Sequence, residues 1–231
     1  YLLNSHSFYE IFKNRLIDTT VGSIIAFIAA YVLVPSWEKT QLNTYVTKAL
    51  QASRRYFETV ATTFSTGVSN DLDYKLSRKE AFIEQANLSG GFTRMMNEPK
   101  NKQGDIKKIH QMVVLIYTLN SHIVSLAGFS RNFTNKYGDE DFHSIKEDII
   151  AELDEALLLI EHKEVKETTH NAPSELKDEL EELVAKRRRE LQQGLVDTET
   201  RTVLVEFKPV VDQFLFISRI TGDIKKLAKD F

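Results

Sequence analysis

The chain of 231 residues contains no cysteine, only four prolines and only nine glycines. Without cysteine it has no disulfide, no thiolate nucleophile and no zinc site of the cysteine type. The few prolines and glycines leave long stretches without a helix breaker. No stretch alternates apolar and polar residues for long enough to predict a sheet. The net charge is only −3, which argues against a general nucleic-acid binder. These absences together predict an all-α protein.

The longest hydrophobic run covers residues 16–37, near the N-terminus. At about 1.5 Å per residue it is long enough to cross a hydrocarbon core about 30 Å thick. Arg15 and Asp18 stand at its beginning, and Pro35 and Trp37, the only tryptophan, stand at its end. A signal peptide would need a shorter apolar stretch and a small-residue cleavage site, so we expect a membrane-spanning helix instead.

The domain boundary is expected directly after this helix. Residues 1–37 are predicted to be the last transmembrane helix of a membrane bundle, and residues 38–231 a cytoplasmic helical domain that folds without the membrane. The chain begins with Tyr1 rather than methionine, so we expect a processed product or a fragment, here one helix and a domain of a larger membrane protein. Asp71 is a candidate helix cap. Apolar periodicity predicts helices at about residues 9–33, 38–65, 71–96, 105–129 and 197–229.

The predicted helix at residues 105–129 has two interpretations. Its centre, residues 112–129, is apolar on nearly all sides, which would suit a second membrane span. Asn120, Ser121 and His122 interrupt this apolar surface, so we favour the central helix of a soluble bundle. The last predicted helix is expected to pack on it.

Residues 139–194 differ from the rest of the chain in charge. They hold 17 acidic and 8 basic residues, a net charge of −9, which leaves the remainder at +6. Two apolar stripes flank a turn with Pro173, a pattern typical of an antiparallel helical hairpin. The basic run at residues 186–189 is expected to pair with acids of the hairpin. We expect this acidic hairpin to protrude away from anionic lipid.

Five short motifs follow one another over the first hundred residues. They are Arg15-x-x-Asp18-Thr19-x-x-Gly22, Pro35-x-Trp37-Glu38, Asp73-Tyr74-Lys75-Leu76-Ser77-Arg78-Lys79-Glu80-Ala81, Asn87-Leu88 and Phe92-x-Arg94-Met95-x-x-Glu98-Pro99. In this order and spacing they resemble the final membrane helix and the following cytoplasmic segment of the fusaric-acid-resistance-type (FUSC) transporter-like family, in its YccS/YhfK-like bacterial branch. The acidic hairpin has no matching motif.

The resemblance implies an integral inner-membrane protein with two membrane bundles that exports aromatic or other organic acids. This chain would supply its C-terminal part, with one membrane helix and with the soluble helices as an assembly or regulatory domain. The alternative is a single-span, membrane-anchored helical bundle that binds a protein partner and does not transport. No catalytic nucleophile–base pair is visible, so no enzyme is expected.

Arg15, Asp18 and Thr19 are the candidates for a substrate pathway. Arg15 and Asp18 are three residues apart, share a helix face and can pair. Such a pair at membrane depth usually faces a protein interior or a water-filled cavity, where Arg15 would attract an organic carboxylate. The other interpretation is an interfacial anchor that only sets the depth of the helix. Gly22 and Ala26 form a small-x-x-x-small pattern, expected where membrane helices touch.

The other motif residues are expected to be structural, and Gly90 and Gly91 only to loosen their helix. The six histidines show no metal-ligand spacing, so neither a metal nor a cofactor is expected. Expected partners are the remaining membrane helices of the same polypeptide, the lipid bilayer and, as a further candidate, a second copy, without nucleic acid. The expected location is the bacterial inner membrane, multi-pass in the full-length protein, with the bulk of this chain on the cytoplasmic side. The structural motif residues are Pro35, Trp37, Arg94, Glu98 and Pro99.

Overall fold

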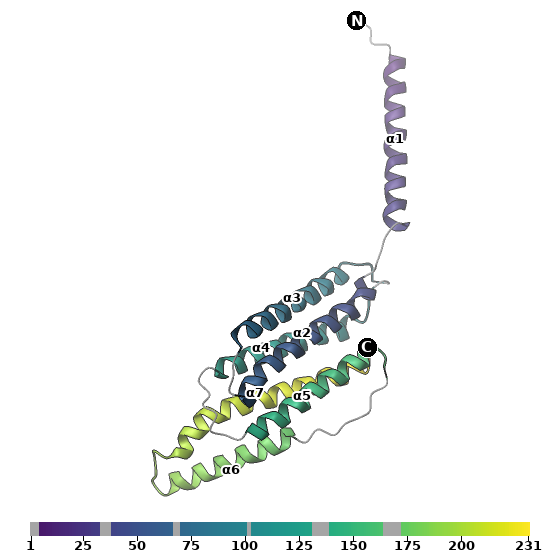
Figure 1. Cartoon of the computed structure of the whole chain (residues 1–231). Coiled ribbons are helices and arrows are strands. Elements are labelled where there is room, and N and C mark those ends of the chain that lie inside the picture. The colour runs from purple at the N-terminus through teal and green to yellow at the C-terminus, as the bar shows by residue number, and fades with distance from the viewer. Residues whose placement is uncertain (1–4, 33–37, 67–69, 101–102, 131–138, 164–171) are drawn as a thin grey trace. The chain divides into compact units, whose positions relative to one another are not determined.

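The computed structural model describes residues 5–32, 38–66, 70–100, 103–130, 139–163 and 172–231. These residues form seven α-helices and no strand, which confirms the predicted all-α class (Figure 1). Internal contacts divide the chain into two units, Tyr1–Trp37 and Glu38–Phe231. The helices are α1 (Ser5–Val32), α2 (Glu38–Thr66), α3 (Asp71–Met96), α4 (Ile106–Ser130), α5 (Asp139–Ile160), α6 (Ala172–Gln192) and α7 (Glu199–Ala228).

The second unit is a helical bundle with α2 and α7 at its centre. Helix α2 packs on α3, α4 and α5, while α7 packs on α4, α5 and α6. Helices α2, α3 and α4 run up and down as neighbours (Figure 1). Glu152 contacts Thr221 and Glu155 contacts Lys225, so the contacts advance together along α5 and α7. These two helices therefore run in the same direction, and α7 lies on α4 as predicted.

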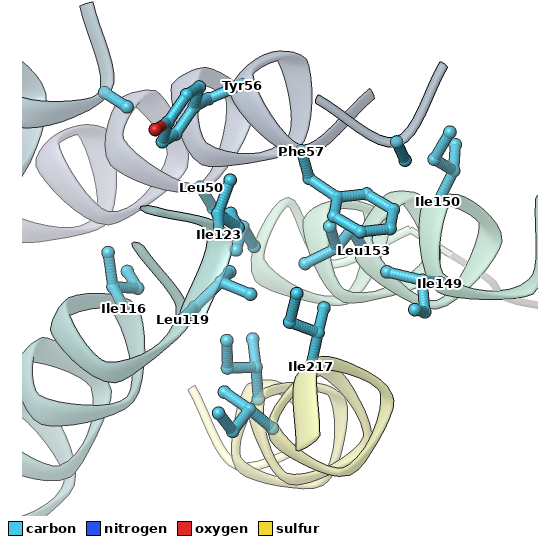
Figure 2. Close-up of a cluster of buried hydrophobic side chains, with 14 of the residues drawn as sticks. Leu50, Tyr56, Phe57, Ile116, Leu119, Ile123, Ile149, Ile150, Leu153 and Ile217 are labelled. Carbon is cyan, nitrogen blue, oxygen red and sulfur yellow. The ribbon is translucent and has the colours of Figure 1, made fainter. Parts of the chain in front are cut away.

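Phenylalanine rings join helices that are far apart in the sequence. The ring of Phe214 in α7 lies 6.1 Å from Phe57, 5.8 Å from Phe64 and 5.3 Å from Phe142, measured between ring centroids. All four side chains are buried, and in Figure 2 Phe57 lies over Leu153 of α5. Burial of one such side chain stabilises a fold by about 1.5–3 kcal/mol. The cluster therefore packs side chains of α2, α5 and α7 together in one hydrophobic core.

Local chemistry sets the ends of α3. The N-cap is Asn70 rather than Asp71: its Oδ1 accepts hydrogen bonds from the backbone N–H of Leu72 at 3.1 Å and of Asp73 at 3.4 Å. Asp71 lies instead in the first turn, where a negative charge favours the helix dipole. The helix ends at Met96, shortly before Pro99, because proline has no backbone N–H to continue the helical hydrogen bonds.

Helices α5 and α6 do not form an arm of their own. Ile145, Ile149 and Leu153 of α5 are fully buried, and α5 packs more extensively on α2 and α7 than on α6. Helix α6 packs mainly on α7 and projects with the first turns of that helix (Figure 1). The hairpin predicted over residues 139–194 is corrected accordingly: α5 is a core helix, because α2 and α7 cover its apolar stripe.

Among the described residues, α4 is the helix that is long and apolar enough to cross a membrane, by length and composition only; the span predicted over residues 16–37 ends outside them. Eight of its residues are buried, and α2, α3 and α7 pack around it. Its open side carries Val114 and Tyr117, which are 46% and 60% exposed. This enclosure on three sides is the arrangement expected for the central helix of a bundle.

Candidate functional site

The predicted pathway residues lie on the continuous helix α1. The Thr19 hydroxyl donates to the backbone carbonyl of Arg15 at 2.8 Å, and Thr20 and Ser23 donate to the carbonyls four residues before them at 2.7 Å. These hydroxyls are therefore satisfied without water, as a membrane helix requires. The side chains of Arg15 and Asp18 are exposed, and within the described part of the chain no ion pair joins them.

One face of α1 combines the charged pair with small side chains. Arg15, Asp18, Gly22, Ala26 and Ala29 follow one another at spacings of three or four residues, so the helical period places them on one side. A Cβ atom added at Gly22 would meet no heavy atom within 4 Å. The small size of Gly22 therefore serves no contact among the described residues, and it leaves room for the close approach of another helix.

Large apolar side chains are exposed on every side of α1. Eleven large apolar side chains between Phe8 and Ile28 are 48–73% exposed. In water such a surface is unfavourable, so the helix needs lipid or other helices around it. The end of the predicted span, with Pro35 and Trp37, lies outside the described residues.

Arg94, a motif residue, connects α3 to α2 through Tyr45. Its Nη2 donates to the Tyr45 hydroxyl at 3.3 Å, and its guanidinium carbon lies 5.8 Å from the centre of the Tyr45 ring. Tyr45 donates in turn to Gln41 Oε1 at 3.0 Å. A Cβ atom at Gly91 would lie only 2.8 Å from Cδ2 of Tyr45. Gly91 is thus not a loosening residue, because its missing side chain lets the Tyr45 ring lie against the backbone of α3.

The two other described motif residues, Glu98 and Pro99, belong to the connection between α3 and α4. Glu98 is half-buried and Pro99 is exposed. Gln103 binds the end of α3 and the motif, since its Nε2 donates to the backbone carbonyls of Met96 at 3.0 Å and Glu98 at 2.7 Å. The motif therefore lies where Gln103, shortly before α4, is held to the end of α3.

Acidic side chains of α5 bind cations on both neighbouring helices. Asp154 accepts hydrogen bonds from Arg54 Nε at 2.6 Å and Nη2 at 3.0 Å. The hydrogen bond to Asp154 raises the pKa of the Arg54 guanidinium, although burial opposes the rise. On the other side Glu155 pairs with Lys225 of α7, where both side chains are largely buried. These pairs are not predicted from the sequence, where the only signal for them is that the acids flank the apolar stripe of α5.

A polar network holds the turn between α6 and α7. Arg187 donates to two carbonyls of this turn, at 3.1 and 2.7 Å, and pairs with Glu190 at 3.3 Å. Glu190 also accepts the hydroxyls of Thr198 and Thr200, each at 2.5 Å. These hydrogen bonds lower the pKa of the Glu190 carboxyl. The expected pairing of the basic run is therefore confirmed for Arg187.

Two polar atoms buried in the bundle have no hydrogen-bond partner among the described residues. They are the hydroxyl of Tyr56 and Oδ1 of Asn120. Burial raises the pKa of the Tyr56 hydroxyl, and the neighbouring Tyr74 adds to the rise. The amide of Asn120 donates to Gln85 at 2.8 Å. In the same described ranges no group of three or more histidine, cysteine, aspartate or glutamate side chains is placed to hold a metal ion.

Comparison with known proteins gives three relatives. The chain is 24% identical over 185 residues to the inner membrane protein YccS of Escherichia coli. The aligned region covers 80% of this chain and 23% of that protein. It is 31% identical over 121 residues to an uncharacterized protein of Haemophilus influenzae, covering 52% of this chain and 17% of the relative. It is also 30% identical over 92 residues to the uncharacterized protein ORF2 of Neisseria gonorrhoeae, covering 39% of this chain and 22% of that protein.

No protein-family model matches the chain, and no solved structure matches it. The chain spans less than a quarter of the length of these relatives. It is an all-α chain and a distant relative of an inner membrane protein.

Proposed function

We propose that this chain is the C-terminal part of a bacterial inner-membrane protein of the fusaric-acid-resistance type, which exports aromatic or other organic acids. Helix α1 is its last membrane helix, and α2–α7 form a cytoplasmic assembly or regulatory domain. The observation that carries the proposal is the surface of α1 beyond Arg15, which carries exposed large apolar side chains on every side and, apart from Asp18, no charged residue. Similarity to an inner membrane protein over 80% of the chain supports the same conclusion.

The polar face of α1 gives the proposal its mechanism. Arg15 and Asp18 share that face with Gly22 and Ala26. Small residues pack against other helices, so the charged pair points toward the protein interior rather than lipid. There the planar guanidinium of Arg15 binds the carboxylate of the exported acid through two parallel hydrogen bonds. Asp18 balances the positive charge when the site is empty.

Export by the full-length protein tests this mechanism. Cells are loaded with benzoate, an aromatic carboxylate, and its efflux is measured for Arg15→Lys and Arg15→Gln. Both variants should export more slowly at unchanged protein level and membrane insertion, because neither offers a planar fork. Lys13→Gln is the matched control, since this exposed cation lies on the opposite side of the same helix. Normal efflux in both Arg15 variants would leave only the anchor role.

The second candidate is the single-span bundle that binds a protein and does not transport. It is favoured by a groove of about 600 Å³ between α4 and α7. Val114 and Leu115 supply apolar surface to this groove, and Asp223 and Lys226 supply charge. Efflux distinguishes the candidates: deletion of the full-length gene leaves benzoate export unchanged if the protein only binds a partner.

A further inference from the structure

Four chain segments meet at one end of the bundle. They are the first turns of α2, the described residues between α3 and α4 with their adjoining turns, the end of α5, and the last turns of α7. Their residues are 38–48, 94–100 with 103–110, 157–163 and 222–231, and we call this region the basic end. A cavity of about 210 Å³ is lined jointly by Asn43 of α2, Lys108 of α4 and Phe231 beyond α7. Lys108 Nζ also donates to the backbone carbonyl of Asp230 at 3.1 Å. Figure 1 shows the same helix ends gathered together.

The basic end differs in charge from the rest of the bundle. Its four segments hold ten basic and six acidic residues, a net charge of +4. Residues 1–37 carry two charges of each sign, so residues 38–231 have a net charge of −3 and the part outside the basic end has −7. Lys48, Lys100 and Lys107 are exposed there. The bundle is thus positive at one end and negative over the remainder.

Chain connectivity places this end near the bilayer if α1 is a membrane helix, a step that rests on the proposed function. Only residues 33–37 separate α1 from α2. Five residues span at most about 18 Å, whatever their conformation. Helix α2 has 29 residues and is therefore about 43 Å long, so its other end can lie far from the surface. The field of anionic headgroups decays over about 8–10 Å, so only nearby charges respond to it.

We propose that the basic end rests on anionic phospholipid headgroups, and that the acidic remainder, repelled by the same surface, holds the bundle upright. Lysines near the surface are attracted to anionic lipid, and carboxylates are not. The turn between α6 and α7, on the projecting part of the bundle, then points away from the membrane. In this arrangement the lipid surface sets the orientation of the domain relative to the membrane helices.

Energy transfer in vesicles tests the orientation on the whole chain. The chain has no cysteine, so one reporter thiol carries the donor dye at a chosen position. Gln111→Cys places it on the exposed surface of α4 near the basic end, and Val196→Cys places it in the α6–α7 turn. The acceptor is a headgroup-labelled lipid. Vesicles contain phosphatidylcholine alone or with added phosphatidylglycerol.

Added phosphatidylglycerol should raise transfer from the position-111 dye by roughly twofold or more, and leave the position-196 dye unchanged. Salt at about 1 M should abolish the rise, because the Debye length falls to about 3 Å. Reversal of three basic-end charges should remove it, and reversal of three exposed charges elsewhere should not. The first set is Lys100→Glu, Lys107→Glu and Lys226→Glu, and the matched control is Lys79→Glu, Lys186→Glu and Arg188→Glu.

Two failures are distinguishable. Equal transfer in neutral and anionic vesicles, or equal loss in the variant and its control, overturns the lipid contact alone. Flotation of the vesicles after alkaline washing reports whether α1 is inserted. A chain that alkali releases overturns the membrane anchor of the proposed function, and the lipid contact with it.

Discussion

Replacement of Gly91 by alanine should destabilise the bundle even though alanine is the better helix former. Alanine in place of glycine inside a helix normally gains about 0.5–1 kcal/mol. At Gly91 the new methyl group would lie 2.8 and 2.9 Å from Cδ2 and Cε2 of Tyr45, so the ring must move. Forced movement of a packed group costs about 1–3 kcal/mol. We therefore expect a net loss of about 0.5–2 kcal/mol in the free energy of unfolding.

Gly90 provides a control one residue away. A Cβ atom there would meet only Nη1 of Arg94, at 3.3 Å, which is the end of a flexible side chain. Gly90→Ala should therefore gain about 0.4–1 kcal/mol. Urea unfolding of the whole chain in mild detergent, followed by circular dichroism, measures both changes. In a Tyr45→Ala background Gly91→Ala should become stabilising, because the clashing ring is gone. A Gly91→Ala variant as stable as Gly90→Ala would refute the packing argument.

Three further predictions use the same unfolding measurement. Tyr56→Phe should be neutral or stabilising by about 0.5–1 kcal/mol, because it removes a buried hydroxyl without a hydrogen-bond partner, and a loss above about 1 kcal/mol would contradict this. Lys225→Met should cost about 3 kcal/mol because it leaves the Glu155 charge buried, whereas the double variant Lys225→Met with Glu155→Leu should recover most of the loss, and no recovery would argue against the ion pair. Because the folded-state pKa of Glu190 is lowered, its stabilising contribution should be constant above the ordinary glutamate pKa of about 4.3 and disappear as the pH falls through the lower folded-state value. The stability difference between the wild type and Glu190→Gln should shrink at acid pH, and a difference that stays constant down to about pH 3 would disprove the shift.

The helices themselves could be predicted because their signals are local. The α3 helix was expected at residues 71–96, and the structure has Asp71–Met96, since a polar cap precedes it and Pro99 follows it. The cap itself was misplaced by one residue, because Asn70 and Asp71 are both good capping residues. Which of two such neighbours caps the helix depends on the backbone φ and ψ angles of each residue, and the sequence alone does not give these angles.

The packing of α5 could not be predicted because its partners lie far away in the chain. Asp154 of α5 binds Arg54, which lies 100 residues earlier in the sequence. The acidic composition of residues 139–194, taken alone, indicated a solvated arm. The packing role of Gly91 could not be predicted for the same reason, since it depends on Tyr45 in another helix. Periodicity identifies which face of a helix is apolar, but it does not identify the helix that covers that face.

The aromatic contacts that join α2 to α5 and α7 determine when the domain can fold during synthesis. Phe57 and Phe64 are made early, but the ring that covers both, Phe214, is made about 150 residues later. At about 5–20 residues per second, this delay is about 8–30 s. For that time Phe57 and Phe64 of α2 lack the ring that covers them in the folded domain.

During this delay the nascent domain exposes apolar surface, which is the kind of surface that chaperones bind. A stop within α7 before Phe214 would leave the same face permanently open, and such a chain should aggregate or be degraded although most of its helices are complete. Helix α7 therefore completes the core, because the faces of α4 and α5 that it covers stay open until residues 199–228 have been made.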